Sequence, residues 1–254
     1  MRSDIAALQR LYGADFTTNQ GDTVYKWNPG NGITLINGVT AISPGANRIF
    51  ATIWDGNGND TYDLTAYTTG VQVDLRPGYG SSFSSTQKAN LGGGVLASAN
   101  IYNAYQYNGD ARSLIENVWT GSGSDSLICN QARNVLRGMA GNDMLQGLQG
   151  DDYLSGGLGN DKLYGGSGAD QFQFVQVSSK DSSTGADTIY DFSTTSGDVI
   201  YLKGNTSITS WLYLITNHLV QTTAGAQVRA PDGSTILLSG VSVASVQAND
   251  FYFG

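Results

Sequence analysis

The sequence is short of the residues from which catalytic centres and covalent cross-links are usually built. Its 254 residues include one cysteine, Cys129, and one histidine, His218. One cysteine cannot form an intrachain disulfide, and one histidine cannot supply the paired imidazoles of an HExxH zinc site. The motifs GxSxG and GxxxxGKS/T are missing as well. We therefore expect no enzymatic activity from this chain, and we interpret His218 and Cys129 as packed or surface residues.

Charged residues are also scarce, and basic residues are fewer than acidic ones. Thirteen Lys and Arg stand against 21 Asp and Glu, for a net charge of −8, and charged residues form 13% of the chain. This acidic balance disfavours nucleic acids and anionic membranes as partners and favours cations. No run of about 18 apolar residues predicts a membrane span, and the N-terminal stretch MRSDIAALQRLYG lacks the apolar segment of a signal peptide. The 40% hydrophobic content argues against disorder.

Glycine, in contrast, occupies 34 positions, and much of it lies in an internal repeat. From Gly138 the chain reads GMAGNDMLQ, GLQGDDYLS, GGLGNDKLY and GGSGADQFQ, so that a glycine opens each unit of nine residues. The same frame fits TGSGSDSLI and CNQARNVLR just before. The sixth position holds Asp or Asn and the eighth holds Leu or Phe: Asp125, Asn134, Asp143, Asp152, Asp161 and Asp170, then Leu127, Leu136, Leu145, Leu154, Leu163 and Phe172. Repeats of this kind indicate a solenoid.

Each unit predicts a glycine-rich turn followed by a strand of three residues whose middle side chain points inward. Stacked units would pile the Leu and Phe side chains into one core and would line the turns with carboxylates and backbone carbonyls. Such hard oxygen ligands suit calcium, and the nonapeptide resembles the calcium-binding RTX repeat of the parallel β-roll. Over residues 120–173, six acids against three bases would repel without the ion, so calcium should be coupled to folding. A flexible Gly/Asp linker is the alternative, but it gives no reason for the phased Leu and Phe residues.

The segments around the repeat divide the chain into three parts. Residues 1–119 begin with a short helix over 1–13, capped by Gly13, in which Ile5, Leu8, Leu11 and Tyr12 share a face; strands are predicted in TVYKW, RIFATIW, TYDL and VQVDL. Residues 120–173 form the RTX roll. Residues 174–254 form a β-sandwich-like cap with strands in ADTIYDF, DVIYL, LYLI, AQVRA, STILL and DFYF. The predicted fold class is all-β: a parallel β-roll flanked by antiparallel strands, with one N-terminal helix.

Longer stretches resemble the serralysins, secreted zinc metalloproteases of the metzincin clan (M10). SDIAALQRLYGADFTTNQGDTVYKWN is similar to the segment after their catalytic domain, and IWDGNGNDTYDL to their first isolated calcium turn. SLIENVWTGSGSDSLICNQARNVLRG is similar to their entry into the roll, and GADTIYDFSTTSGDVIYL to the strands after it. The resemblance spans essentially the whole chain and is weakest over 76–112 and 203–249. It implies a non-catalytic, calcium-binding C-terminal domain.

The resemblance also implies calcium ligands, carried over position by position. One ion would lie between main-chain groups near Asn19, Gly21 and Thr23 and the residues Asp55, Asn57 and Asp60; the family usually has Arg where Asn19 stands. A second ion would be held by Gly58, Asp60, the Leu114 carbonyl and Glu116. Gly121, Gly123 and Asp125 would pair with Asn130, Ala132 and Asn134. The later turns would contribute Gly138, Ala140, Gly141, Asp143, Gly147, Gln149, Gly150, Asp152, Gly156, Leu158, Gly159, Asp161, Gly168 and Asp170. Asp187, Asp191 and Asp198 would either close the last sites or remain solvated acids at strand ends.

The implied function is calcium-triggered folding outside the cell, support of a covalently preceding protease domain, and export by a type I secretion apparatus. Cytosolic calcium is too low to fill weak sites, whereas extracellular calcium would fill them. Such proteins carry an uncleaved C-terminal signal, which the run Asp250–Phe251–Tyr252–Phe253 fits, although Gly254 follows it. The family motif HExxHxxGxxH and the Met-turn are missing from this chain, so protease activity would belong to a region before Met1.

Two other functions stay open. A free-standing RTX module for adhesion or carbohydrate binding could use Trp27, Trp54, Trp119, Trp211 and some of the 14 tyrosines, although aromatic residues also pack cores. A module of another exported enzyme, such as a polysaccharide lyase or epimerase, is the second. The segment DIAALQRLYG, which resembles the protease junction, argues against that second function.

Overall fold

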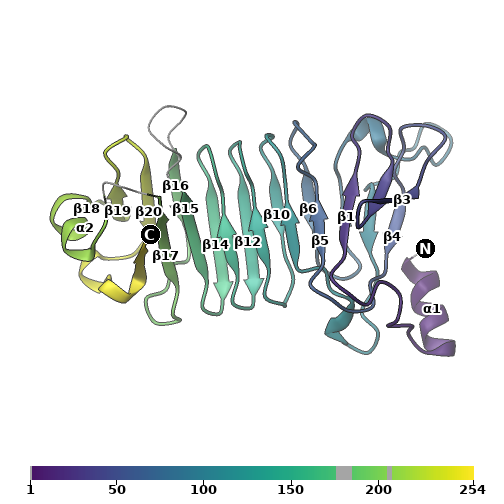
Figure 1. Cartoon of the computed structure of the whole chain (residues 1–254), viewed down its shortest axis with the longest axis horizontal. Helices are drawn as coiled ribbons and strands as arrows, with labels where there is room; N and C mark the ends of the chain where they lie inside the picture. The colour runs from purple at the N-terminus through teal and green to yellow at the C-terminus, as the bar shows by residue number, and fades with distance from the viewer. Residues whose placement is uncertain (1, 176–184, 205–207) are drawn as a thin grey trace. The chain divides into compact units, whose positions relative to one another are not determined.

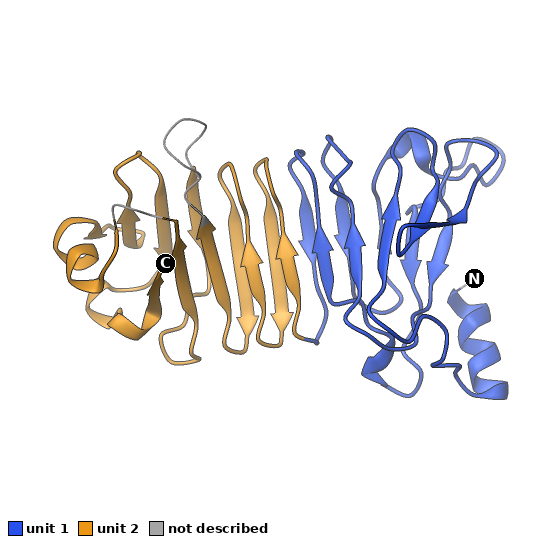
Figure 2. Ribbon diagram, in the orientation of Figure 1, with its two compact units in different colours: residues 1–132 blue, residues 133–254 orange. Residues whose placement is uncertain are grey.

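The computed structural model describes residues 2–175, 185–204 and 208–254. The chain forms two compact units, residues 1–132 and 133–254 (Figure 2). In their described residues, both units are built mainly of short strands, with one α-helix in each (Figure 1). The all-β fold class is therefore confirmed, while the three-part division of the sequence stays a prediction.

Unit 1 begins with the predicted helix, α1 (Arg2–Tyr12). Gly13, at φ 83°, ends it by donating its N–H to the Gln9 carbonyl at 2.8 Å, a common helix terminus for a residue without a side chain. The helix is confirmed, but its apolar face is uncovered. Leu8 and Leu11 are 58% and 74% exposed, whereas the polar Gln9 is buried.

The strands of unit 1 form three groups. One sheet has the order β9–β5–β1–β2–β3, parallel among β9, β5 and β1 and antiparallel from β1 to β3. Strands β6 and β10 pair in parallel, and a small sheet has the order β4–β8–β7. The elements are β1 (Val24–Trp27), β2 (Thr34–Ile36), β3 (Val39–Ile42), β4 (Ala51–Ile53), β5 (Thr61–Asp63), β6 (Gln72–Asp74), β7 (Gly80–Ser81), β8 (Ile101–Asn103), β9 (Asn117–Trp119) and β10 (Ser126–Ile128), with 3₁₀ turns η1 (Ser85–Gln87) and η2 (Ala111–Ser113). The four strands predicted before the repeat correspond to β1, β4, β5 and β6.

An aromatic cluster fills the core of unit 1. The Trp27 ring is fully buried and lies 5.2 Å from Tyr62 and 4.9 Å from Phe83, centroid to centroid. The Trp54 indole donates its N–H to the Asp15 carbonyl. These contacts give both tryptophans a packing role.

Unit 2 consists of two sheets of stacked strands. One has the order β21–β17–β15–β13–β11, all parallel. The other has the order β18–β19–β20–β16–β14–β12, parallel from β20 to β12 and antiparallel from β18 to β20. The elements are β11 (Val135–Arg137), β12 (Met144–Gln149), β13 (Tyr153–Ser155), β14 (Lys162–Ser167), β15 (Gln171–Val175), β16 (Ala186–Ile189), β17 (Val199–Lys203), β18 (Leu219–Gln221), β19 (Gly225–Arg229), β20 (Thr235–Ser239) and β21 (Phe251–Phe253), with α2 (Trp211–Asn217), η3 (Val243–Ser245) and η4 (Ala248–Asp250).

The repeat builds this arrangement because successive units enter opposite sheets. Val135 pairs with Tyr153, and Met144 pairs with Lys162, so a full coil takes two nine-residue units. The predicted inward ladder is confirmed, since all six eighth-position side chains, Leu127, Leu136, Leu145, Leu154, Leu163 and Phe172, are 0% exposed. Ile189 and Ile200 continue it beyond the repeat, also at 0%.

The region after the repeat differs from the prediction in two ways. LYLI is not a strand but part of α2, because Ser210 caps a helical turn by accepting the Tyr213 N–H, and only Leu214 of the helix is buried. Strands β16, β17, β20 and β21 are also not antiparallel additions, since each extends a parallel sheet of the roll. Among the described residues after the repeat, antiparallel strand pairing is limited to β18, β19 and β20.

Stacked tyrosines mark the outer surfaces of both sheets in unit 2. The rings of Tyr164 and Tyr190 lie 4.7 Å apart at an angle of 7°, and those of Tyr201 and Tyr252 lie 4.8 Å apart at 11°. This spacing equals the separation of about 4.8 Å between neighbouring strands. In-register parallel pairing therefore places each ring over the next.

Candidate metal sites in the turns

The sixth-position aspartates of unit 2 join consecutive coils. Asp161 Oδ1 accepts the Asp143 N–H at 2.8 Å, and Asp170 Oδ1 accepts the Asp152 N–H at 3.0 Å. Asp152 Oδ1 accepts the Asn134 N–H at 2.7 Å in the same way. Each carboxylate thus reaches back to the equivalent position one coil earlier. One oxygen of each aspartate has a structural partner for this reason.

The second oxygen of the same aspartates has none. Within the described residues, the Oδ2 atoms of Asp152, Asp161 and Asp170 are buried without a hydrogen-bond partner. Each lies beside the glycine that opens its unit: a Cβ atom placed on Gly147 would lie 2.3 Å from Asp152 Oδ2 and 2.5 Å from the Gly165 carbonyl oxygen. A buried anionic oxygen with a carbonyl oxygen nearby fits a hard cation, because calcium binds oxygen ligands at about 2.3–2.6 Å.

Burial makes these carboxylates reluctant to ionise without a cation. It raises the pKa of Asp152 to about 7, with a further contribution from the negative charge of Asp170. Burial likewise raises the pKa of Asp161 and of Asp170 to about 6. A bound cation would replace the lost hydration and restore the charged form.

Beyond the repeat, Asp187 continues the ladder contact, whereas Asp191 and Asp198 use both of their carboxylate oxygens. Asp187 Oδ1 accepts the Asp161 N–H at 2.9 Å, and burial raises the Asp187 pKa to about 8. Asp191 uses both oxygens to accept the N–H groups of Gly165 and Gly166. Asp198 also uses both, accepting from Asp170 N and the Ser196 hydroxyl on Oδ1 and from Ser193 N on Oδ2. Asp191 and Asp198 therefore hold backbone N–H groups of neighbouring turns. The sequence had suggested either calcium ligands or solvated acids at these positions, and neither of these includes such a role.

Unit 1 contains a separate acidic cluster formed by Asp55, Asp60 and Glu116. Asp60 Oδ1 accepts the Thr23 N–H at 2.8 Å, and the Asp60 N–H donates to Glu116 Oε2 at 2.7 Å. Burial and the nearby charge of Asp55 raise the Asp60 pKa to about 8, and burial raises the Glu116 pKa to about 7. The pKa of Asp55 is raised too, chiefly by burial. The Tyr25 hydroxyl donates to Asp55 Oδ2 at 2.7 Å. Like charges buried together favour an intervening cation.

The turns predicted to share the first ion do meet in the structure. A Cβ on Gly58 would lie 2.8 Å from the Gly21 carbonyl oxygen. The Thr23 hydroxyl donates to the Gly21 carbonyl and, more weakly, to the Asn19 carbonyl, and the Asn57 N–H donates to Asp55 Oδ1. Leu114, predicted to offer its carbonyl, is a buried residue next to the Glu116 segment.

The pairing predicted for the 121–125 turn is wrong. Asp125 Oδ1 accepts the Val71 N–H at 2.8 Å, and a Cβ on Gly121 would lie 1.8 Å from the Tyr67 carbonyl oxygen. Asn130 instead closes its own turn, since its Oδ1 accepts the Ala132 N–H and its amide donates to the Ile115 carbonyl. Coils stack on the second unit away, not on the next one.

The 65–71 turn was therefore missed from the sequence. Its residues, TAYTTGV, share no motif with the repeat. Only the geometry of the stacked coils identifies it as the partner of Gly121, Gly123 and Asp125.

The remaining predicted turn residues of unit 2 lie in stacked turns. Ala140 and Leu158 form a bridge, and the Gly141 N–H donates to the Leu158 carbonyl. Gln149 pairs with Ser167. Gly138 and Gly156 lie beside the Oδ2 atoms of Asp143 and Asp161, and Gly159 and Gly168 lie against the carbonyls of Gly141 and Gly150.

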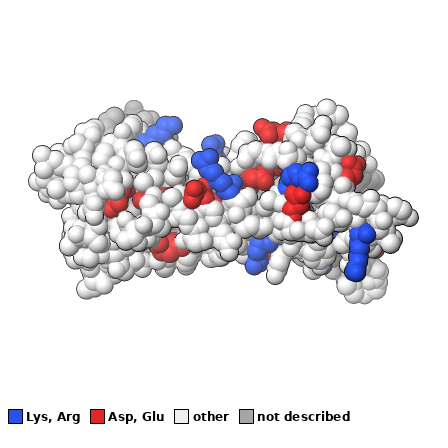
Figure 3. All heavy atoms as spheres, turned by 90° about the horizontal axis from the view of Figure 1, so that it is seen from below, with Lys and Arg blue, Asp and Glu red and all other residues white. Residues whose placement is uncertain are grey.

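Side chains alone do not make a metal centre here. Among the described residues, no group of three or more His, Cys, Asp or Glu side chains is arranged to hold a metal, so a cation would draw many ligands from main-chain carbonyls. The face in Figure 3 is mostly uncharged, with acidic and basic groups scattered over it. This agrees with the burial of the sixth-position aspartates of the ladder.

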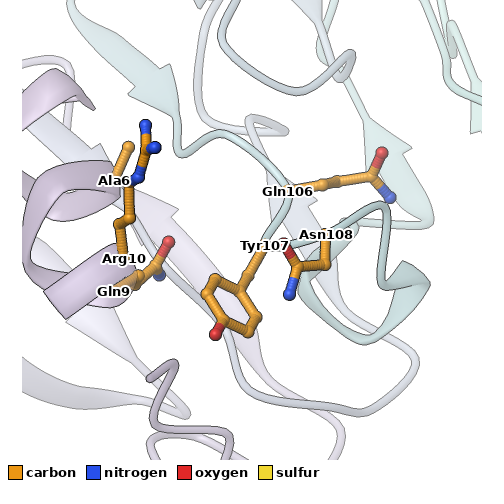
Figure 4. A pocket seen from close by; sticks show the side chains of 6 residues that line it. All are labelled: Ala6, Gln9, Arg10, Gln106, Tyr107 and Asn108. Carbon is orange, nitrogen blue, oxygen red and sulfur yellow. The ribbon is translucent and has the colours of Figure 1, made fainter. Parts of the chain in front are cut away.

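A pocket of about 420 Å³ lies elsewhere in unit 1, beside α1 (Figure 4). Gln9 and Arg10 line it from the helix, and Tyr107 and Asn108 line it from the facing loop. Arg10 is its one charged lining residue, so the pocket offers no carboxylate for a cation. In the described part of the chain, no helix combines the length and apolarity that crossing a membrane requires.

Comparison with known proteins links this geometry to one family. Residues 14–236 match the family described as peptidase M10 serralysin C terminal. Metallopeptidase AprA of Pseudomonas marginalis is 37% identical over 134 residues, which are 53% of this chain and 24% of that protein. Serralysin G of Dickeya chrysanthemi is 36% identical over 131 residues (52% and 23%), and serralysin of Proteus mirabilis is 36% identical over 133 residues (52% and 23%). The matching part thus spans about a quarter of the length of these relatives.

Proposed function

Because the chain belongs to the serralysin C-terminal family of M10 peptidases, we propose that it is the non-catalytic, calcium-binding domain of a secreted serralysin-like metalloprotease. Its roles are calcium-triggered folding outside the cell, stabilisation of a covalently preceding protease domain, and type I export. The relatives named above are called metallopeptidases or serralysins, and the matching part covers only about a quarter of each.

One observation carries the calcium role. The Oδ2 atoms of Asp152, Asp161 and Asp170 are buried without a hydrogen-bond partner among the described residues. An unpartnered buried carboxylate oxygen costs free energy, because burial removes its hydration. Three of them in equivalent positions form a repeated feature, and a hard cation at each position removes the cost.

The ligands follow from these positions. In unit 2, calcium would be held by the sixth-position carboxylates with carbonyls of the glycine-rich turns, and in unit 1 by Asp55, Asp60 and Glu116 with main-chain groups of 19–23. Bound calcium supplies positive charge that offsets the carboxylate repulsion. The protein residues supply the ordered turns, which form only when neighbouring coils stack. Ion binding and coil stacking therefore favour each other.

The uncovered face of α1 supports the proposed partner domain. Leu8, Leu11 and Tyr12 are 58%, 74% and 83% exposed, which is costly for three apolar side chains on one short helix. A protease domain joined before this helix would have an apolar surface to pack against. The helix then belongs to the junction between the domains.

A calcium titration of the chelator-treated chain tests the proposal. Far-UV circular dichroism and thermal melting should show a cooperative gain of β structure and a rise in Tm as calcium reaches the millimolar range. Magnesium at the same concentration is the control, because its strict octahedral geometry fits these turns poorly. A native spectrum in excess chelator, with a Tm that calcium leaves unchanged, would contradict the folding role.

A further inference from the structure

A buried phenol joins two segments of the acidic cluster in unit 1. The Tyr25 hydroxyl donates to Asp55 Oδ2 at 2.7 Å, and the Asn19 side-chain amide donates to the Tyr25 hydroxyl oxygen at 2.9 Å. Tyr25 and Asp55 are each 1% exposed. Asn19 belongs to the 19–23 segment and Asp55 to the 55–60 turn, which are the two segments proposed to share an ion. The phenol therefore links them through two hydrogen bonds.

The ring of Tyr25 is fixed by the aromatic core. It lies 6.4 Å from the Trp27 ring at an angle of 17°, and 5.9 Å from the Tyr62 ring at 87°, centroid to centroid. Tyr25 is also the register partner of Tyr62 where β1 pairs with β5. A ring packed at core density cannot move far without clashes. Strand pairing and ring packing together therefore set the position of the hydroxyl.

Asp55, in contrast, lies in a turn, two residues beyond the end of β4 at Ile53. Its Oδ1 accepts the N–H of Asn57 from the same turn at 3.1 Å. This local contact ties the carboxylate to its own turn, whereas the Tyr25 hydroxyl ties it to the sheet. The hydrogen bond from Tyr25 thus carries the order of the core to the Asp55 carboxylate.

The position of Asp55 matters because of its neighbour Asp60. Asp60 Oδ2 is buried and has no hydrogen-bond partner in the described part of the chain, like the ladder oxygens of unit 2. The charge of Asp55 adds to the larger effect of burial in raising the Asp60 pKa, so the two carboxylates lie close together. A cation between them would offset both the burial and the repulsion. Without a restraint on Asp55, the repulsion would push the two carboxylates apart before the cation arrives.

We propose that Tyr25 is a positioning residue of the unit 1 metal site: its hydroxyl holds the Asp55 carboxylate beside Asp60, ready for the cation. This inference rests on the proposed calcium role and adds a residue that is not itself a ligand. Hydrogen bonds from surrounding residues orient metal ligands, and their loss typically lowers metal affinity ten- to a hundredfold. The same hydrogen bond links ion binding to the packing of the aromatic core.

The test compares Tyr25→Phe with Tyr62→Phe in the full chain, by urea unfolding across the calcium concentrations at which the parent is folded. Both variants keep the ring and lose one buried hydroxyl of the same cluster. The Tyr62 hydroxyl, however, donates to the amide oxygen Oδ1 of Asn103 at 2.7 Å and not to a carboxylate. Tyr62→Phe is therefore the matched control for the loss of a buried hydrogen bond.

We expect Tyr25→Phe to weaken calcium binding in unit 1 about tenfold. Its loss of stability should grow as calcium rises through the affinity of the site, and the added loss should level off at about 1.4 kcal/mol, the equivalent of that tenfold change. The loss in Tyr62→Phe should be the same at every calcium concentration. Only a role in ion binding makes the loss depend on calcium.

A double-mutant cycle tests whether Tyr25 acts through Asp55. Asp55→Asn keeps an oxygen that can accept the Tyr25 hydroxyl but removes the charge. In that background, Tyr25→Phe should no longer alter the calcium dependence of stability, whereas Tyr62→Phe should have the same effect as in the parent.

A second pair of variants serves if Tyr25→Phe does not fold. Asn19→Gly removes the donor to the phenol, and glycine suits the backbone angle of φ 51° at that position. Asn108→Gly, also at φ 51° in unit 1, is its control. The loss in Asn19→Gly should grow with calcium, and the loss in Asn108→Gly should not.

Equal calcium dependence of the two members of the pair that is measured would overturn the inference and leave Tyr25 as a packing residue. An effect of Tyr25→Phe that persists unchanged in the Asp55→Asn background would overturn it as well. Neither result would contradict the calcium role itself. Failure of the proposed function looks different: calcium would then leave the stability of the parent chain unchanged, and the role of Tyr25 would fail with it.

Discussion

At the scale of single residues, the two oxygens of a sixth-position carboxylate have different partners, and one substitution can separate their roles. Asp161→Asn keeps an acceptor for the Asp143 N–H but removes the buried charge. In chelator at pH 8 we expect the free energy of unfolding to rise by about 1–2 kcal/mol, because the variant no longer buries a desolvated charge. In millimolar calcium the same variant should be less stable than the parent. Urea unfolding in both conditions measures the reversal.

Asp151→Asn is the matched control for this reversal. Asp151 is the exposed neighbour of a ladder aspartate, and its Oδ1 accepts the Ala169 N–H at 2.9 Å, which an amide oxygen also can. Its stability should change by less than about 0.5 kcal/mol in either condition. If Asp161→Asn and Asp151→Asn behave alike, the ladder carboxylate has no special link to calcium.

Acidification should stabilise the metal-free chain. Burial raises the pKa of Asp161 to about 6, of Asp152 to about 7 and of Asp187 to about 8, against an ordinary value of 3.8. Between the ordinary and the raised values the folded state binds more protons than the unfolded state, so the free energy of unfolding falls as pH rises. In chelator, Tm should therefore be higher at pH 5 than at pH 8. A Tm that rises steadily from pH 5 to pH 8 would show that these carboxyls are not buried as described.

At the scale of the elements, stacking of the turns depends on close backbone contact. Gly168 has φ 137°, and a Cβ there would lie 2.0 Å from the Gly150 carbonyl oxygen. Gly168→Ala should lower the free energy of unfolding by about 2–3 kcal/mol or more, since both the backbone angle and the contact exclude a side chain. Thermal or urea unfolding in saturating calcium measures this loss.

Gly45→Ala is the corresponding control. Gly45 is exposed, lies outside the left-handed region and would have no atom within 4 Å of its new Cβ. Its stability should change by less than about 0.5 kcal/mol. Similar effects of the two alanines would mean that coil stacking tolerates a side chain at position 168.

The elements also show how far the sequence predicts this fold. The nine-residue phase alone predicted the turn, the strand and the inward Leu and Phe of every unit, because period and burial are coupled in a solenoid. It did not predict that each unit stacks on the second unit away, because this follows only once it is known that successive units enter opposite sheets. It could not identify the 65–71 turn as a partner of Asp125, since the contacts there are made by main-chain groups of the turn, such as the Val71 N–H, that any sequence carries. LYLI was misassigned because four apolar residues fit a short helix as well as a strand, and the Ser210 cap decides between them.

For the whole molecule, the buried acids of both units predict that calcium binding releases protons. Asp60 and Asp187 have pKa values of about 8, and Asp152 and Glu116 of about 7, so near pH 7 part of these groups hold protons without the ion. Calcium needs the ionised form. Calorimetry in buffers of different ionisation enthalpy should therefore detect more proton release at pH 7 than at pH 9. Equal release at both pH values would contradict the assignment.

The stacked tyrosines offer a spectroscopic signal for the assembly of the roll. In each pair, Tyr164 with Tyr190 and Tyr201 with Tyr252, the rings are nearly parallel. Tyr201 and Tyr252 belong to neighbouring parallel strands, and Tyr190 directly follows β16, the parallel neighbour of β14, which holds Tyr164. Electronic transitions of rings held this close and this fixed are coupled, and the coupling gives a circular dichroism signal in the near ultraviolet that separated rings lack. Tyr190→Phe and Tyr252→Phe would remove the two contributions one at a time. The native chain thus carries its own optical probes, one on each sheet of unit 2, for following when the strands come into register.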